Sequence, residues 1–374
     1  MRMLRIMLSL ALVGTVLTVS AQPDRNSAVG SVLDYIVLNR SEVGIACFPI
    51  GNPGAGVYLN ADERFPLASV GKILVLAEYA RRIAEGQLDP MERVPLADVD
   101  AYWLPRTDGN RHQAWLEETP TRDGTVPLFE IARSMMYYSS NAATDYLAER
   151  FGRASFVDLY ARLNIRDIDY PTNWIGLFLT LENHQDGVRS VEDFDAESFQ
   201  AESDRLTRLY VDHAAWRLAE RANRAGQGRG FIANGEEQNA YFERYGAQGT
   251  PRAVARLMSA IFSGELISER VSAIMRDIMD WEMDNPTNRV DFNMLATKGG
   301  SLPGILTGAW FAAPRGSLED IQPRQPTALA VFYRGMPIAQ YRSWQRDPDQ
   351  RLLEIDALRN GCGVLSRAVG QPSR

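Results

Sequence analysis

The chain has 374 residues, of which 45% are hydrophobic and 23% charged, and its formal net charge at pH 7 is −7. This length suits one large domain or two intertwined lobes. The acidic balance argues against a protein that binds nucleic acid or anionic membranes.

Residues 1–21 have the pattern of a cleavable signal peptide. Arg2 and Arg5 precede an apolar run from Ile6 to Val19, and Val19-Ser20-Ala21 is a small-residue cleavage site. The run is too short to favour a transmembrane helix, although an uncleaved anchor is the alternative. We therefore expect an exported protein, periplasmic or secreted, without stable membrane insertion.

The first part of the chain predicts a helix, two strands and a longer helix. Apolar spacing over residues 25–39 is typical of an amphipathic helix. Strands are expected from Glu42 to Ile50 and from Gly56 to Leu59, joined by a Gly/Pro/Asn turn. A long helix is expected from Ser69 to Glu85, with Ser69 as its N-cap and Gly86 just past its end.

The middle of the chain is expected to be helical and its end to return to strands. Helices are predicted at Pro127 to Tyr137, Asn141 to Arg150, Thr250 to Phe262, Glu269 to Trp281 and, mostly helical, Leu352 to Val369. Strands are predicted at Met294 to Lys298, Ile305 to Ala312 and Thr327 to Tyr333. Two stretches look like additions. Residues 103–121 are loop-like, and residues 181–248 hold a charged helical segment (about Glu197 to Arg224) and a Gly-rich connector at 225–230.

This order predicts an α/β (α+β) fold with a five-stranded antiparallel sheet flanked by N- and C-terminal helices. An all-helical lobe is inserted into it. We expect the α/β lobe at about 22–95 and 285–374, and the helical lobe at about 96–284, including the insertion 181–248. A groove between the lobes is the expected place for an active site.

The two cysteines, Cys47 in an apolar run and Cys362 in the last helical segment, are too few for a disulfide scaffold. Export permits a bridge between them. Two separate buried thiols are the alternative.

Of the 40 basic residues, two are lysines, Lys72 and Lys298. Guanidinium keeps its proton in proteins, whereas a desolvated lysine amine can lose it. Lys72 ends the run Ser69-Val70-Gly71-Lys72, in which the amine can reach the serine hydroxyl from the same helix face. A base of this kind turns serine into a nucleophile, and the N–H groups of Ser69 and of the strand near Ser301 can form an oxyanion hole. An N-capping serine and a solvated lysine are the alternative, but the apolar residues that follow Lys72 indicate burial.

Two further elements add to this pattern. Ser139, in Ser139-Ser140-Asn141 between two helices, can relay a proton to a leaving nitrogen, and Asn141 can hold both Lys72 and a substrate carbonyl. Lys298-Gly299-Gly300 ends a predicted strand, where the glycines let a substrate approach and Lys298 can hold an anionic group. A helix-capping turn and a polar hairpin turn are the alternatives for these two elements.

Taken together, the three elements resemble those of class A β-lactamase-like serine hydrolases, within the penicillin-recognising serine acyl transferases. The resemblance covers Gly44 to Lys72, Asp123 to Leu147 and Thr250 to Leu266, and resumes from Thr297 through the last strand and helix. It implies catalytic roles for Ser69 (nucleophile), Lys72 (base), Ser139 (proton relay) and Lys298 (carboxylate-side cation), and substrate contacts for Asn141, Gly300, Ser301 and Tyr102. Tyr102 can instead be a surface aromatic of its loop.

The chain departs from that family at two places. Class A β-lactamases carry a glutamate in a Glu-x-x-Leu-Asn loop for deacylation, where this chain reads Ile168-Asp169-Tyr170-Pro171-Thr172-Asn173-Trp174-Ile175-Gly176. Asp167, Asp169 or Glu182 are possible substitutes. Gly299 stands where a hydroxyl residue usually follows the lysine, and Ser301 can supply a hydroxyl nearby.

The expected function is an exported serine hydrolase that forms an acyl-enzyme on Ser69 with a β-lactam or related amide. The substrate is a small molecule or peptide, with neither a cofactor nor a metal, since His112, His184 and His213 lack metal-ligand spacing. A D,D-carboxypeptidase acting on cell-wall peptides, like a penicillin-binding protein, is one alternative. The other is a non-catalytic binding module that uses residues 181–248 as a partner surface.

Overall fold

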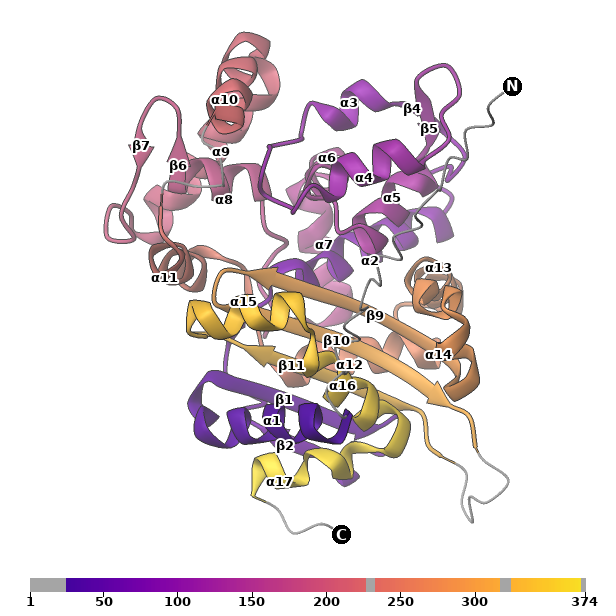
Figure 1. Ribbon diagram of the computed structural model, residues 1–374. Coiled ribbons are helices and arrows are strands. Elements are labelled where there is room, and N and C mark those ends of the chain that lie inside the picture. The colour runs from indigo at the N-terminus through magenta and orange to yellow at the C-terminus, as the bar shows by residue number, and fades with distance from the viewer. Residues whose placement is uncertain (1–24, 227–232, 317–323, 371–374) are drawn as a thin grey trace, which may run out of the picture.

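A five-stranded antiparallel sheet, built from both ends of the chain, organises the protein (Figure 1). The computed structural model describes residues 25–226, 233–316 and 324–370. The strand order is β2-β1-β11-β10-β9. The strands are β1 (Val43–Pro49), β2 (Val57–Leu59), β9 (Phe292–Leu302), β10 (Ile305–Pro314) and β11 (Thr327–Tyr333). Pairing of β1 with β11 joins the two ends of the chain, which confirms the predicted fold class.

Helices cover both faces of the sheet. One face carries α1 (Arg25–Leu38), α15 (Ile338–Arg346), α16 (Asp349–Asn360) and α17 (Ser366–Val369), in front of the sheet in Figure 1. The other carries α12 (Pro251–Ser263), behind which lie α2 (Lys72–Ala84) and α13 (Glu269–Met279). In β11, Leu329 and Val331 pack on the first side while Ala330 and Phe332 pack on the second. This two-sided burial explains why the strands read as nearly continuous apolar runs.

The middle of the chain is largely helical and surrounds α2 on the side away from the sheet. Its helices are α3 (Leu96–Asp100), α4 (Arg111–Glu118), α5 (Leu128–Tyr137), α6 (Asn141–Phe151), α7 (Arg153–Leu163), α8 (Trp174–Leu181), α9 (Ala196–Asp212), α10 (Ala214–Gly226) and α11 (Gly235–Tyr245). Three two-stranded ladders tie its loops together: β3 (Phe65–Pro66) with β8 (Gln248–Gly249), β4 (Arg93–Pro95) with β5 (Thr125–Pro127), and β6 (Glu182–Asn183) with β7 (Gly187–Val188). Contacts of α2 with α5, α6 and α13 make it the central helix of this part.

One expectation about the additions was wrong, and the expected charged helical segment is indeed helical. The stretch 103–121 contains the helix α4, whose buried His112 and Trp115 are three residues apart and so share one face. The charged residues of this short segment obscure the apolar periodicity from which a helix is predicted. The charged helical segment divides at His213 into α9 and α10. Most of the Gly-rich connector, and the expected signal peptide, lie outside the described residues.

The strand that carries Lys298 was also predicted too short. β9 continues through the two glycines to Leu302, so Lys298 lies inside the strand rather than at its end or in a hairpin turn. The hairpin to β10 follows at Pro303 and Gly304, where Gly304 has a φ of +76°. Pairing with β10 across Gly299↔Gly308 and Gly300↔Thr307 keeps the glycines in the ladder.

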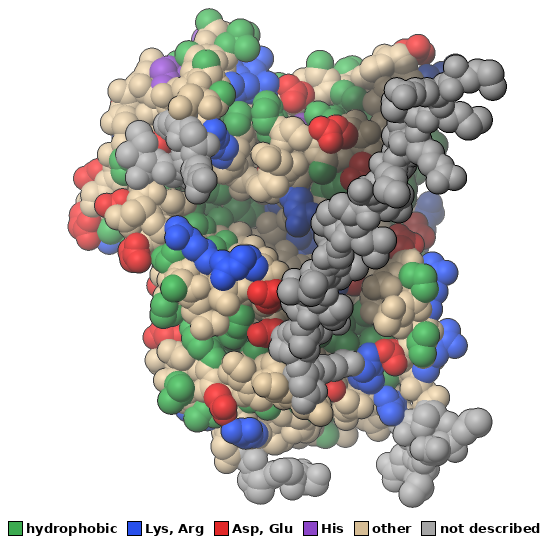
Figure 2. Space-filling view, in the orientation of Figure 1, with side chains coloured by type: hydrophobic (Ala, Val, Ile, Leu, Met, Phe, Trp, Pro, Cys, Tyr) green, Lys and Arg blue, Asp and Glu red, His purple; other side chains and the backbone are tan. Residues whose placement is uncertain are grey.

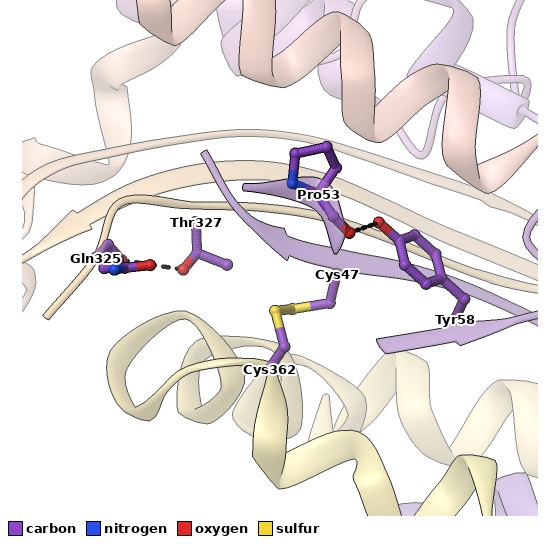
Figure 3. The surroundings of a disulfide bond; sticks show 6 residues. All are labelled: Cys47, Pro53, Tyr58, Gln325, Thr327 and Cys362. Atoms are coloured by element: carbon purple, nitrogen blue, oxygen red, sulfur yellow. Dashed lines mark hydrogen bonds between the residues drawn. A yellow bond between two sulfur atoms is a disulfide. The ribbon is translucent and has the colours of Figure 1, made fainter. Parts of the chain in front are cut away.

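A disulfide joins the first strand to the C-terminal helices. Cys47 of β1 and Cys362, just after α16, are bonded with their Cα atoms 5.6 Å apart (Figure 3). The two residues are separated by 315 positions in sequence. The structure therefore decides between the two alternatives for the cysteines in favour of the bridge.

No helix among residues 25–226, 233–316 and 324–370 combines the length and apolar character needed to cross a bilayer.

Candidate active site

Ser69 lies in a 3-10 turn, Ala68–Gly71, that leads into α2. Ser69 is 9% exposed. The prediction that it is the N-cap of the helix was wrong, because the 3-10 turn begins one residue before it. Thr307 on β10 donates a hydrogen bond of 2.9 Å to the carbonyl of Leu67 and so fixes the turn to the sheet. A Cβ atom on Gly300 would lie 2.7 Å from the Ser69 nitrogen, so a glycine at this position lets β9 approach the turn closely.

Lys72 is enclosed directly behind this turn, with 1% of its surface exposed. Its Nζ donates to the carbonyl of Ser139 (2.6 Å), the Ser139 hydroxyl (3.3 Å) and the Asn141 side-chain oxygen (2.7 Å). Burial and the charge of Lys298 hold the pKa of Lys72 well below its usual value of 10.5, against a smaller opposing effect of Asp108 and Asp145. Within residues 25–226 no hydrogen bond joins the Ser69 hydroxyl to Lys72, so the predicted direct contact is not formed in this state.

The hydroxyl of Ser139 accepts hydrogen bonds from both lysines, Lys72 and Lys298. Ser139 sits in the turn between α5 and α6 with a φ of +62°, and Lys298 Nζ donates to its hydroxyl at 3.0 Å. Lys298 also donates to the carbonyl of Gly299 at 2.7 Å. Burial, followed by the nearby charge of Arg111, lowers the pKa of Lys298 to about 7. A hydroxyl between two amines of lowered pKa can take and give a proton near neutral pH.

A buried histidine supports this turn from behind. Ser140 accepts a hydrogen bond from the Ala143 N–H as the N-cap of α6, and its hydroxyl lies 3.0 Å from His112 Nδ1. The other ring nitrogen of His112 faces Asp100 at 3.6 Å, beyond hydrogen-bond length. Asp100 in turn pairs with Arg221 of α10 at 3.0 Å. Sequence patterns assign no role to His112, because Ser140, its partner in the fold, lies 28 positions away in the chain.

Asp145 fixes the segment 168–176, where the resemblance noted in the sequence predicts a deacylating glutamate. Its carboxylate oxygens accept from the backbone N–H groups of Trp174 (3.0 Å) and Ile175 (2.8 Å). Burial raises the pKa of Asp145 to about 7, although these two hydrogen bonds oppose the shift. The Trp174 ring then lies over Lys72, with Nζ 4.9 Å from its centroid. The indole therefore forms part of the enclosure of Lys72.

The three possible substitutes for the glutamate lie elsewhere. None of Asp167, Asp169 and Glu182 belongs to the described lining of the cavity that contains Ser69. Asp169 pairs with Arg64, and Glu182 accepts from the backbone N–H of Ala233.

The cavity in front of Ser69 has a volume of about 950 Å³ and collects most of the predicted site residues. Its lining includes Ser69, Ser139, Asn141, Lys298, Gly300 and Ser301. The surface is visibly hollowed between the helices above and α15 below, with Lys or Arg side chains inside the hollow (Figure 2). Among the described lining residues Tyr102 does not appear, and its ring packs edge-on against Tyr146 instead.

Two predicted substrate contacts already have partners. Asn141 donates through its side-chain nitrogen to the carbonyl of Thr107 at 3.1 Å, in addition to holding Lys72. The Ser301 hydroxyl lies 2.8 Å from the hydroxyl of Tyr341 on α15. The segment 103–121, a cavity wall that the sequence did not place, thus reaches the centre of the site. Among the described residues no cluster of three His, Cys, Asp or Glu side chains could hold a metal ion.

Solved structures share the fold of the chain, and a family model shows its family. A β-lactamase from Sphaerobacter thermophilus is 17% identical, with a TM-score of 0.53 over 93% of this chain and 99% of that one. A β-lactamase from Chitinophaga pinensis is 16% identical, with a TM-score of 0.51 over 88% and 99%. No curated protein matches the sequence. Residues 39–315, well over half of the chain, match the model of the Beta-lactamase enzyme family, and the chain belongs to that family.

Proposed function

We propose that this protein is an exported serine hydrolase that forms an acyl-enzyme on Ser69 with a β-lactam or a related amide. The observation that carries the proposal is the meeting of the Lys72 and Lys298 amines at the Ser139 hydroxyl, in the wall of the cavity that Ser69 lines. Burial lowers the pKa of Lys298 to about 7 and holds the pKa of Lys72 well below its usual 10.5, so both amines lose a proton more readily than an ordinary lysine.

In the proposed reaction, neutral Lys72 takes the Ser69 proton as the serine oxygen attacks the substrate carbonyl. The N–H groups of Ser69 and of β9 near Ser301 stabilise the negative charge on the carbonyl oxygen. When the carbon–nitrogen bond breaks, the proton passes from Lys72 through the Ser139 hydroxyl, 3.3 Å away, to the leaving nitrogen. Water then releases the acyl group as a carboxylic acid and restores the Ser69 hydroxyl.

Release is expected to be slow. The family glutamate is absent, Trp174 covers Lys72, and both oxygens of Asp145 are occupied by backbone N–H groups. We expect nitrocefin turnover below about 10² per second. This upper limit is about tenfold above the median turnover rate of enzymes. Stopped-flow absorbance measures the turnover, and a faster steady rate would contradict this expectation.

The proposal is tested by incubating the full chain with fluorescent penicillin and measuring the mass of the intact protein by mass spectrometry. One adduct should form and map by peptide analysis to Ser69, and Ser69→Ala should abolish it. Ser190→Ala, a change of an exposed serine remote from the cavity lining, is the matched control and should label normally. Labelling that survives Ser69→Ala would refute the assignment.

The same preparation separates the alternatives. Release of the terminal D-alanine from a D-Ala-D-Ala peptide would favour a D,D-carboxypeptidase. If a folded wild-type protein shows neither labelling nor hydrolysis of an ester or amide, the scaffold is a binding module. Export is supported by the disulfide, which forms in oxidising compartments. Protein recovered from the periplasm or medium with a mature N-terminus near Gln22 is the expected result.

A further inference from the structure

Three cationic side chains line the catalytic part of the cavity without an anionic partner. Arg106 and Arg111 come from the segment 103–121, and Lys298 comes from β9. Across the part of the chain that the structure describes, none of the three forms a salt bridge. Arginines elsewhere commonly do, as with Arg81 and Glu78 or Arg205 and Glu202. Unpaired cations gathered at one cavity need an external anion or water to satisfy them.

Arg106 is the clearest example of a cation without an acceptor for one of its donors. One of its terminal nitrogens donates to the carbonyl of Ala225 at 3.2 Å. The other, Nη1, is enclosed and has no acceptor. A charged donor enclosed without an acceptor is more costly than a neutral one, so a ligand anion that reaches it gains a charge-assisted hydrogen bond.

The cations stand at two ends of the predicted substrate position. Arg111 is close enough to Lys298 for its charge to act on that amine. Both therefore flank the end at which a ring carboxylate is expected. Thr107, next to Arg106, is bonded to Asn141, the side chain expected to hold the substrate amide. Because Arg106 precedes Thr107 in the chain and lines the same cavity, it is expected on the side of the acyl group, beyond the amide.

Carboxylates of the same wall offset only part of this charge. Asp108 and Glu118 also line the cavity. One Asp108 oxygen accepts from the backbone N–H of His112 at 3.2 Å, and the other is buried without a hydrogen-bond partner. Glu118 accepts from the hydroxyl of Tyr138. Glu354 lines a different part of the cavity, next to Trp310 of β10. The catalytic part remains cationic within a protein whose formal net charge is −7, which concentrates anionic ligands there.

We propose that the acyl donor of this enzyme carries two anionic groups, one held by Lys298 and Arg111 and a second, on its acyl side chain, held by Arg106. This proposal rests on the proposed function. It narrows the substrate class to dianionic amides or lactams.

Benzylpenicillin and carbenicillin test it, because carbenicillin adds one carboxylate to the same acyl side chain. The measurement is the second-order rate constant of adduct formation, followed by intact mass. Wild-type protein should acylate with carbenicillin at least about tenfold faster, a difference of about 1.4 kcal/mol. Arg106→Gln should abolish this preference by slowing carbenicillin at least about tenfold more than benzylpenicillin. Arg111→Gln should slow both compounds, since both carry the ring carboxylate.

Arg122→Gln is the matched control, because Arg122 is an exposed arginine outside the described cavity lining. It should change neither constant. The preference should also shrink as NaCl is added, since exposed charges are screened. If Arg106→Gln does not fold, Arg106→Lys replaces it and should keep part of the preference, and the salt dependence of the wild type then decides.

Equal rate constants for the two penicillins in the wild type, or a preference that survives Arg106→Gln, would overturn the proposal while leaving the acyl-enzyme intact. A folded wild-type protein that forms no adduct with either compound would instead overturn the proposed function and this inference with it.

Discussion

At the scale of single residues, the proton on Lys72 controls the proposed chemistry. Its burial, 1% exposed, lowers the pKa of the amine well below 10.5, because a charged ammonium is poorly solvated there. The neutral form is the base, so the rate of acylation should rise with pH through the lowered pKa. It should already be near its maximum well below pH 10.5, the usual lysine value.

Lys72→Arg tests this directly. The charge remains but guanidinium does not give up its proton, so the acylation rate constant should fall by about 10²–10⁴-fold. Lys298→Arg is the comparison, because a permanent cation at that position can still hold a carboxylate, and its loss should be smaller. Acylation of the Lys72→Arg variant at the wild-type rate, measured by stopped-flow fluorescence, would exclude Lys72 as the base.

At the scale of elements, α16 is held to β10 by a buried carboxyl group. Glu354 accepts a hydrogen bond of 2.8 Å from the Trp310 indole and lies over Gly308, where any Cβ would clash with it. Burial raises the pKa of Glu354 to about 7 from 4.5. The folded state thus binds a proton that the unfolded state releases between these values. The stability from this group is full below pH 4.5 and is lost as the pH rises towards 7.

Glu354→Gln removes this titration and keeps an acceptor for Trp310. The variant should be more stable than the wild type at pH 8, by up to about 3 kcal/mol in the free energy of unfolding. At pH 4.5 the two proteins should differ little. Urea unfolding followed by tryptophan fluorescence at both pH values provides the measurement. An equal difference at both pH values would show that the carboxyl does not titrate as described.

The elements themselves were predictable to different degrees. The strand from Thr327 to Tyr333 was predicted at its observed bounds, because buried β-branched and aromatic residues end at clear polar boundaries. Helix α4 was missed because two buried rings, His112 and Trp115, are too few to give a periodic signal. The sequence predicts that α2 begins at Ser69, whereas Ser69 lies in a 3-10 turn that precedes the helix. Sequence patterns do not distinguish a 3-10 turn from the first turn of an α-helix.

At the scale of the whole molecule, the disulfide closes the chain onto itself. It ties β1 to the 3-10 turn Cys362–Leu365 that follows α16, across 315 positions, and limits the conformations of the unfolded chain. Replacing both Cys47 and Cys362 with alanine should lower the free energy of unfolding by about 3–5 kcal/mol. Chemical denaturation of the double variant measures this. A reduced wild-type protein should behave like the variant, and a reduced protein as stable as the oxidised one would contradict the expectation.

The sequence by itself determined the fold class and gathered most of the site, because a serine, two lysines and a Ser-Ser-Asn turn are local patterns at element boundaries. The sequence also showed that the segment 168–176 lacks the deacylating glutamate that the resemblance predicts there. Only the tertiary structure decided which cysteines pair, that Trp174 covers Lys72, and that the segment 103–121 reaches Asn141. These are contacts between residues far apart in the chain, and their formation depends on packing and desolvation, which no local spacing encodes.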